Sequence, residues 1–192
     1  MTPSIDGWPA DWEGVAESIV TTLGPNDRWN VAALGLHAGA PVTARTWGRT
    51  RTRRNFEERG EGYVQFTRDP VDFVEAACSV REESAPVLDG ADAWARVTVS
   101  RVDEGESEGT EWVDWALVPV EATVERRAVS VTDRAHAAVV EATVAASRLG
   151  VSGYDDDALR ERIRHSGAVV ERAGGPRAGA AWDRFEELTE WR

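Results

Sequence analysis

The chain has 192 residues, of which 42% are hydrophobic, and 34 acidic residues against 22 basic ones give a net charge of −12. This composition is that of a globular protein and argues against disorder. No apolar stretch reaches the ~20 residues needed to cross a bilayer, and residues 1–12 lack the basic start of a signal peptide. With Cys78 as the single cysteine, we expect a soluble cytoplasmic protein without disulfides and without a membrane partner.

The first half of the sequence predicts antiparallel strands joined by tight turns. β-branched and apolar residues form short runs, and clusters of Gly, Pro, Asn and Asp separate them. The runs span residues 17–23, 29–36, 42–47 and 62–67. Between the last two, residues 50–59 predict a helix that Thr50 or Thr52 caps and Gly60 closes.

A second short helix and further strands follow. Asp69 is suited to the N-cap of this helix, and Pro70 to its first position. Residues 94–102 alternate as a strand, whereas residues 103–111 carry five acids and two glycines and predict an exposed loop. Residues 112–129 are apolar but broken in phase by a proline, which predicts two strands or one strand with a bulge.

The character of the sequence changes at about residue 132, where it becomes rich in alanine and in helical patterns. Three helices are expected, over residues 133–149, 155–172 and 178–191, with Gly150 as the C-cap of the first. Strands followed by helices favour the α+β class. We therefore expect a barrel or sandwich domain over residues 1–131 and a helical C-terminal region over residues 132–192.

A dense positive segment stands out from the acidic background. Residues 45–59 hold six arginines against two glutamates, a net charge of +4. One interpretation is a phosphate site, because a helix N-terminus, threonine hydroxyls and guanidinium groups all bind phosphate oxygens. The other is a solvated helix face whose arginines pair with nearby acids such as Glu57, Glu58 and Glu61. The residue types alone leave both open.

The strand with Asn30 to Gly35 is the second feature that could serve a ligand. Its small side chains would let a flat ligand approach the backbone, although tight packing inside a barrel explains them equally well. Other sites are disfavoured. The chain has no lysine, which excludes a P-loop and Schiff-base chemistry. One cysteine and three scattered histidines lack the spacing of a metal site, and the net charge argues against a nucleic-acid partner.

In order and spacing, several segments resemble the archaeal DUF447 family. They are Thr21-Thr22, Asn30 to Gly35, Arg45-Thr46-Trp47, Thr50 to Asn55, Gly62 to Thr67 and Asp69 to Phe73. This family is similar to the flavin-reductase-like FMN-binding split barrels and has a helical C-terminal region. The resemblance implies a six-stranded antiparallel Greek-key split barrel, a homodimer, and FMN near the dimer interface.

The resemblance also implies the residues that hold FMN. The pair Thr50 and Thr52 would bind the phosphate, and the strand from Asn30 would line the isoalloxazine edge. Arg45 and Thr46 would reach the phosphate or the ribityl chain. Gln65 stands where relatives often have Asn and receives no role. The full set of cofactor-binding candidates is Asn30, Ala32, Ala33, Arg45, Thr46, Trp47, Thr50, Arg51, Thr52 and Asn55.

Two functions follow from these expectations. The first is an FMN-dependent oxidoreductase that takes electrons from NAD(P)H or a redox protein, since the flavin itself carries the chemistry. The second is a non-catalytic FMN-binding or sensing module whose helical region carries the interaction. The acidic, lysine-free composition also predicts adaptation to high intracellular salt, for which a GC-rich genome that replaces Lys codons by Arg codons is the alternative.

Overall fold

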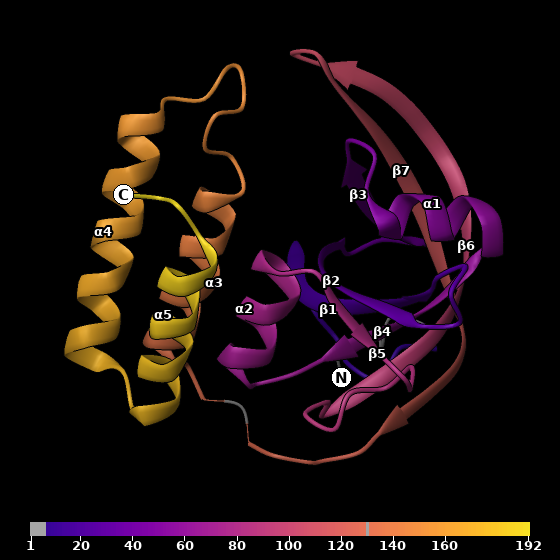
Figure 1. Cartoon of the computed structure of the whole chain (residues 1–192). Helices are drawn as coiled ribbons and strands as arrows, with labels where there is room; N and C mark the ends of the chain where they lie inside the picture. Colours follow the sequence, from indigo (N-terminus) through magenta and orange to yellow (C-terminus); the bar gives the residue numbers. More distant parts are fainter. Residues whose placement is uncertain (1–6, 130) are drawn as a thin grey trace. The chain divides into compact units, whose positions relative to one another are not determined.

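The computed structural model describes residues 7–129 and 131–192 (Figure 1). Residues 1–6 of the segment considered for a signal peptide lie outside this range. The chain divides into two compact units. The first comprises the residues up to Thr67 together with Arg81–Arg127, and the second comprises Arg68–Val80 together with Ala128–Arg192. No helix in the described part of the chain is long and apolar enough to cross a bilayer.

The first unit is a closed antiparallel barrel, which confirms the predicted class and strand number. Its strands follow the order β1-β4-β6-β7-β3-β2, the β1–β2 pair closes the ring, and β5 adds to the free edge of β2. Four strands lie side by side in the order β3-β2-β1-β4, which is the arrangement of a Greek key. The bounds are β1 (Val15–Leu23), β2 (Trp29–His37), β3 (Val42–Trp47), β4 (Glu61–Phe66), β5 (Arg81–Glu83), β6 (Ala93–Ser107) and β7 (Thr110–Val124).

Helix α1 (Arg51–Arg59) is held to the barrel by its buried face. Phe56 of α1 is 2% exposed and meets the ring of Trp115 on β7 edge-on, with 5.4 Å between centroids. The indole N–H of Trp115 donates to Thr46 Oγ1 at 2.9 Å inside the barrel. Burial of two aromatic rings stabilises the fold by several kcal/mol, so this contact fixes the position of α1 on the barrel.

β6 and β7 form one long hairpin, so the predicted loop over residues 103–111 is wrong. β6 continues to Ser107, and Ser107 pairs with Thr110 across a two-residue turn. Glu108 and Gly109 in this turn have φ angles of 50° and 81°, the left-handed pair that joins twisted strands. The acids of this extension are mostly exposed, and hydration makes their charge compatible with a strand.

A β-bulge interrupts β7 at Pro119, which confirms one of the two predicted alternatives. Val97 pairs with Pro119, and Arg96 pairs with Glu121, so Val120 has no partner in the ladder. Proline cannot donate a ladder hydrogen bond, and a bulge accommodates it. β7 therefore continues as a single strand to Val124.

The second unit contains α2 (Pro70–Cys78), α3 (Arg134–Ala146), α4 (Asp156–Ala173) and α5 (Pro176–Leu188). The side chains of Asp69, Asp133 and Asp155 cap the first three helices. The predicted C-cap Gly150 is wrong, because α3 ends at Ala146 and Gly150 lies in the following turn with a φ of 71°. The buried core of this unit is Val74, Ala135, Ala138, Val139, Ala142, Ala145, Leu159, Ile163, Val170, Ala178, Ala181, Phe185 and Trp191.

α2 belongs to this core although barrel strands precede and follow it in the chain. Val74 is fully buried against the helical core. Arg177 Nε donates to Asp69 Oδ1 at 2.9 Å, and Arg184 of α5 pairs with Glu75 of α2. Burial alone would raise the pKa of Asp69, but the hydrogen bonds from Arg177 and from a backbone amide hold it below its usual value. Asp69 therefore stays ionised and paired near neutral pH.

Gly167 in the middle of α4 has a packing role. A Cβ at this position would lie 2.5 Å from Cζ2 of Trp182 on α5. The glycine weakens the helix by up to about 1 kcal/mol relative to alanine, but it lets the indole lie flat against α4.

Candidate functional site

The first turn of α1 is a positively charged helix end. Thr50 is the N-cap, and its hydroxyl accepts a hydrogen bond from the Arg53 amide at 3.1 Å. The amides of Arg51 and Thr52 have no acceptor within the helix. This turn contains no acidic residue. Backbone N–H groups, the helix dipole and arginine side chains therefore combine in a place that favours an anion.

A buried polar cluster joins α1 to β1 and β2. Asn30 Nδ2 donates to Thr52 Oγ1 at 3.3 Å, and Asn55 Nδ2 donates to Thr22 Oγ1 at 3.0 Å. All four side chains are buried. Asn55 Oδ1 has no hydrogen-bond partner among the described residues. Because a buried acceptor without a donor is costly, this atom marks a place that a donor from a ligand or water would stabilise.

Arg51 and Arg53 of α1 are held largely by acids from distant strands. Arg51 Nη1 lies 2.7 Å from Glu82 Oε1 on β5. Arg53 contacts Glu57 at 3.2 Å, within α1, and Glu111 of β7 at 3.1 Å. Of the predicted nearby acids, only Glu57 pairs with an arginine of this segment in the described part of the chain. The hydrogen bond to Glu57 is the main reason that the pKa of Arg53 is raised.

Arg45 and Trp47 lie on the outer face of β3. Nε and Nη2 of Arg45 donate to the two carboxylate oxygens of Asp114, both at 2.7 Å. This bidentate pair raises the pKa of Arg45 and lowers that of Asp114. The guanidinium lies 3.9 Å from the ring centroid of Trp112 and 5.5 Å from that of Trp47. Trp47 is 47% exposed. The Arg45 guanidinium, held by Asp114, therefore lies near an indole that remains accessible.

The remaining predicted residues are less accessible. Thr46 is buried and accepts the Trp115 indole N–H, so its hydroxyl serves the barrel interior. Ala32 packs against the barrel core, and Ala33 is half-buried on the same strand. The structure thus brings together Asn30, Thr50, Arg51, Thr52 and Asn55 at the start of α1.

Gln65 has a structural role that the sequence did not indicate. Its Oε1 accepts from the Leu88 amide at 2.7 Å, and its Nε2 donates to the Pro86 carbonyl at 2.9 Å. Thr21 donates to the same Pro86 carbonyl. Buried Gln65 thus fixes the segment between β5 and β6, and no ligand needs to be invoked for it.

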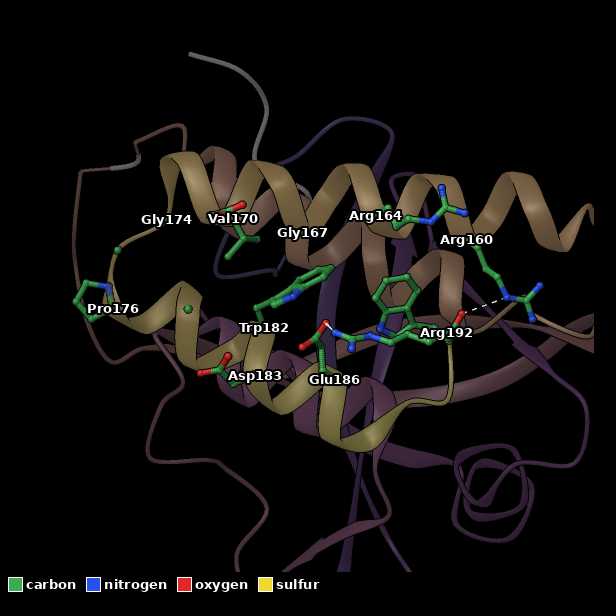
Figure 2. A pocket seen from close by; sticks show the side chains of 14 residues that line it. Arg160, Arg164, Gly167, Val170, Gly174, Pro176, Trp182, Asp183, Glu186 and Arg192 are labelled. Carbon is green, nitrogen blue, oxygen red and sulfur yellow. Dashed lines mark hydrogen bonds and ion pairs between the residues drawn. The ribbon is translucent and has the colours of Figure 1, made fainter.

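The helical unit has its own cavity, of about 930 Å³, between α4 and α5 (Figure 2). Trp182 lies in it, and its lining includes Arg160, Arg164 and Arg192 but none of the predicted cofactor-binding residues. Acids neutralise each of these arginines, as Glu186 does Arg192 in Figure 2. The cavity therefore gathers no unpaired positive charge.

The other titratable candidates stay structural. Burial raises the pKa of the Cys78 thiol to about 11, which keeps it protonated and unreactive near neutral pH. His37 is exposed at the end of β2. Burial lowers the pKa of His136, against the opposing charges of Asp133 and Asp69. In residues 7–129 and 131–192, no three His, Cys, Asp or Glu side chains are arranged to hold a metal ion.

Solved structures resemble this chain to different degrees. An FMN-bound DUF447 protein from Methanosarcina mazei aligns over 92% of this chain and 96% of its own, with 25% identity and a TM-score of 0.76. The styrene monooxygenase flavin reductase of Pseudomonas putida S12 aligns over 59% and 82%, with 12% identity and a TM-score of 0.42. A flavoredoxin from Methanosarcina acetivorans aligns over 60% and 70%, with 13% identity and a TM-score of 0.41. No curated protein matches the sequence.

Two family models cover most of the chain. The N-terminal domain of the family described as protein of unknown function DUF447 matches residues 16–126. The second model, protein of unknown function DUF447, matches residues 133–187. These matches contain the whole barrel except its first residue, and nearly all of helices α3 to α5. The chain therefore belongs to the DUF447 family.

Proposed function

We propose that this chain binds FMN and that the first turn of α1 holds the FMN phosphate. The observation that carries the proposal is the FMN bound to the Methanosarcina mazei family member, which aligns with this chain over nearly its full length. A family relationship combined with a full-length structural match makes a shared cofactor the simplest expectation. The start of α1 supports it, because its chemistry suits a phosphate group.

The residues present fit the proposed phosphate site. The Thr50 hydroxyl and the amides of Arg51 and Thr52 are the donors at the helix start. The exposed side chain of Arg49 can reach a phosphate in front of this turn. Thr52 is only 5% exposed, so its hydroxyl acts chiefly by fixing Asn30. Trp47, which shortly precedes this turn in the sequence, offers an accessible aromatic surface.

We propose an oxidoreductase of the flavin-reductase type as the function. Bound FMN would supply hydride or electron transfer, and the chain would bind it, orient it and limit access of water. NAD(P)H or a redox protein would be the electron donor. The protein would be cytoplasmic and a homodimer. Light scattering of the purified protein tests the dimer. A non-catalytic FMN-binding or sensing module is the alternative. Rapid reduction of bound flavin by NAD(P)H would favour the oxidoreductase.

Loss of the two hydroxyls at the start of α1 is expected to abolish FMN retention. The variant carries Thr50→Ala with Thr52→Ala, which removes a phosphate donor and the acceptor of the Asn30 amide. One charge-assisted hydrogen bond at about 1.5–3 kcal/mol corresponds to a loss of affinity of about ten-fold to a hundred-fold, and the release of Asn30 adds to this loss. The visible spectrum of the purified protein and a titration with FMN measure it.

The matched control is Thr50→Ser with Thr52→Ser, which keeps both hydroxyls and should retain the flavin bands. Circular dichroism separates loss of binding from loss of the helix cap, which itself costs about 1 kcal/mol. A wild-type protein that is colourless and takes up no added FMN would refute the cofactor proposal. An alanine variant that binds FMN as the wild type does would move the phosphate away from α1.

We also propose adaptation to high salt, which predicts that the melting temperature rises with KCl. In dilute buffer the acidic side chains that give the net charge of −12 repel one another. Molar KCl shortens the screening length to about 3 Å and so weakens this repulsion. Sucrose at equal osmolality is the control, because it stabilises by exclusion without screening charge. A protein that is most stable in dilute buffer would favour the codon-usage explanation for the absence of lysine.

A further inference from the structure

The carboxylate of Glu111 lies between two arginines at the approach to α1. Its Oε2 is 3.1 Å from Arg53 Nη1 and 3.8 Å from Arg49 Nε. The backbone keeps it there, because the Glu111 carbonyl accepts the Gly48 amide at 2.7 Å. β7 thus brings a negative charge close to the residues that precede α1. The first turn of α1 contains no acidic residue itself.

The two arginines depend on Glu111 to different degrees. Arg53 keeps a second carboxylate, Glu57, which is also bound by Arg101 at 2.9 Å. The Arg49 side chain is 88% exposed, and Glu111 is its single ion-pair partner among the described residues. The Glu111 side chain is itself 46% exposed. An incoming anion could therefore replace this carboxylate without opening the protein.

We propose that Glu111 is an internal counter-ion that competes with a ligand phosphate for Arg49 and Arg53, and so makes this site select dianionic phosphate. A phosphate monoester carries a charge of about −1.5 to −2 at pH 7 and offers three acceptor oxygens. It therefore displaces a single carboxylate with a gain, whereas a monoanion exchanges one charge for another. The phosphate site in front of α1 and the identity of the ligand as FMN rest on the proposed function; the competition of Glu111 for the arginines goes beyond it.

Glu111→Gln tests this, with Glu106→Gln as the matched control. The two residues face each other across the β6–β7 hairpin, so each substitution removes one charge from the same ribbon. Glu106 has no ion pair in the described part of the chain. Inorganic phosphate, FMN and riboflavin are titrated at the lowest KCl concentration that preserves the native circular dichroism. We expect Glu111→Gln to bind phosphate and FMN about two- to five-fold more tightly than Glu106→Gln, and riboflavin equally.

Equal phosphate affinity of the two variants would overturn the proposal. Weaker binding by Glu111→Gln would also overturn it, because Glu111 would then position the arginines instead of competing for them. If Glu111→Gln does not fold, Arg49→Gln is measured instead, with weaker phosphate binding expected and unchanged binding as the contrary result. Tighter phosphate without any FMN binding would refute the proposed function alone. FMN bound equally by both variants would refute the counter-ion alone.

Discussion

Val74→Asp is expected to unfold the helical unit while the barrel keeps its structure. Val74 is fully buried in the core that α2 shares with α3, α4 and α5. Among the described residues, no cation lies in that apolar core to pair with a carboxylate placed there. An uncompensated buried charge costs roughly 3–5 kcal/mol, a large part of the stability of any domain of this size.

The matched control is Ala77→Asp, which puts the same charge on an exposed position of α2. It is expected to cost less than about 1 kcal/mol, because surface substitutions seldom cost more. Limited proteolysis, with the cleavage sites identified, reports on the helical unit, and β-sheet circular dichroism reports on the barrel. Equal stability of the two variants would show that α2 does not pack in the helical core.

Trp115→Ala is expected to destabilise the barrel by about 3–5 kcal/mol. The ring is 2% exposed, packs on Phe56 of α1, and donates to Thr46. Its removal leaves a cavity, takes away the indole donor that Thr46 Oγ1 accepts from, and loosens α1. Urea unfolding of the ligand-free protein, at a KCl concentration that keeps it native, measures the loss.

Trp47→Ala is the control for this variant, because it removes the same ring from a half-exposed position on the neighbouring strand. Its expected cost is well under half of that for Trp115→Ala, since little packing is lost. A cost for Trp115→Ala no larger than for Trp47→Ala would contradict the assignment of Trp115 to the barrel core. A cooperative loss of the α1 contacts would further predict weaker FMN binding by Trp115→Ala.

Local sequence signals predicted most elements of this fold. Turn residues and alternation located β1 to β4. Capping residues placed the start of α2 at Asp69 and that of α1 at Thr50 or Thr52, of which the structure uses Thr50. These signals work because they act within a few residues of the chain. β5, with only three residues, was missed because a strand so short has no period to detect.

The missed part of the β6–β7 hairpin has a different cause. Acidic residues dominate the extension, and their charge outweighed the two-residue turn at Glu108 and Gly109. Both faces of this part of the hairpin are exposed to water. A strand therefore forms there without an alternation of apolar and polar residues. Turn spacing was the signal that could have found it.

For the candidate site, the sequence indicated the residue types but not the ion pairs between them. The positive segment and the start of α1 were evident from residue types. Its counter-charges Glu82, Glu111 and Asp114 come from β5 and β7, and only strand register reveals that Asp114 faces Arg45. Sequence could not decide which arginines are engaged, because pairing across strands depends on tertiary structure.

The position of α2 sets an order of events during synthesis. α2 is complete at Cys78, but the helix α5 that pairs with its Asp69 and Glu75 ends only at Leu188. At about 5–20 residues per second, the ribosome needs roughly 5–20 s to make the intervening segment. α3, which also packs against α2, is complete at Ala146, so the apolar side of α2 has no helical partner on the nascent chain before then. The helical core is therefore completed only at the end of synthesis, long after the first of its four helices has been made.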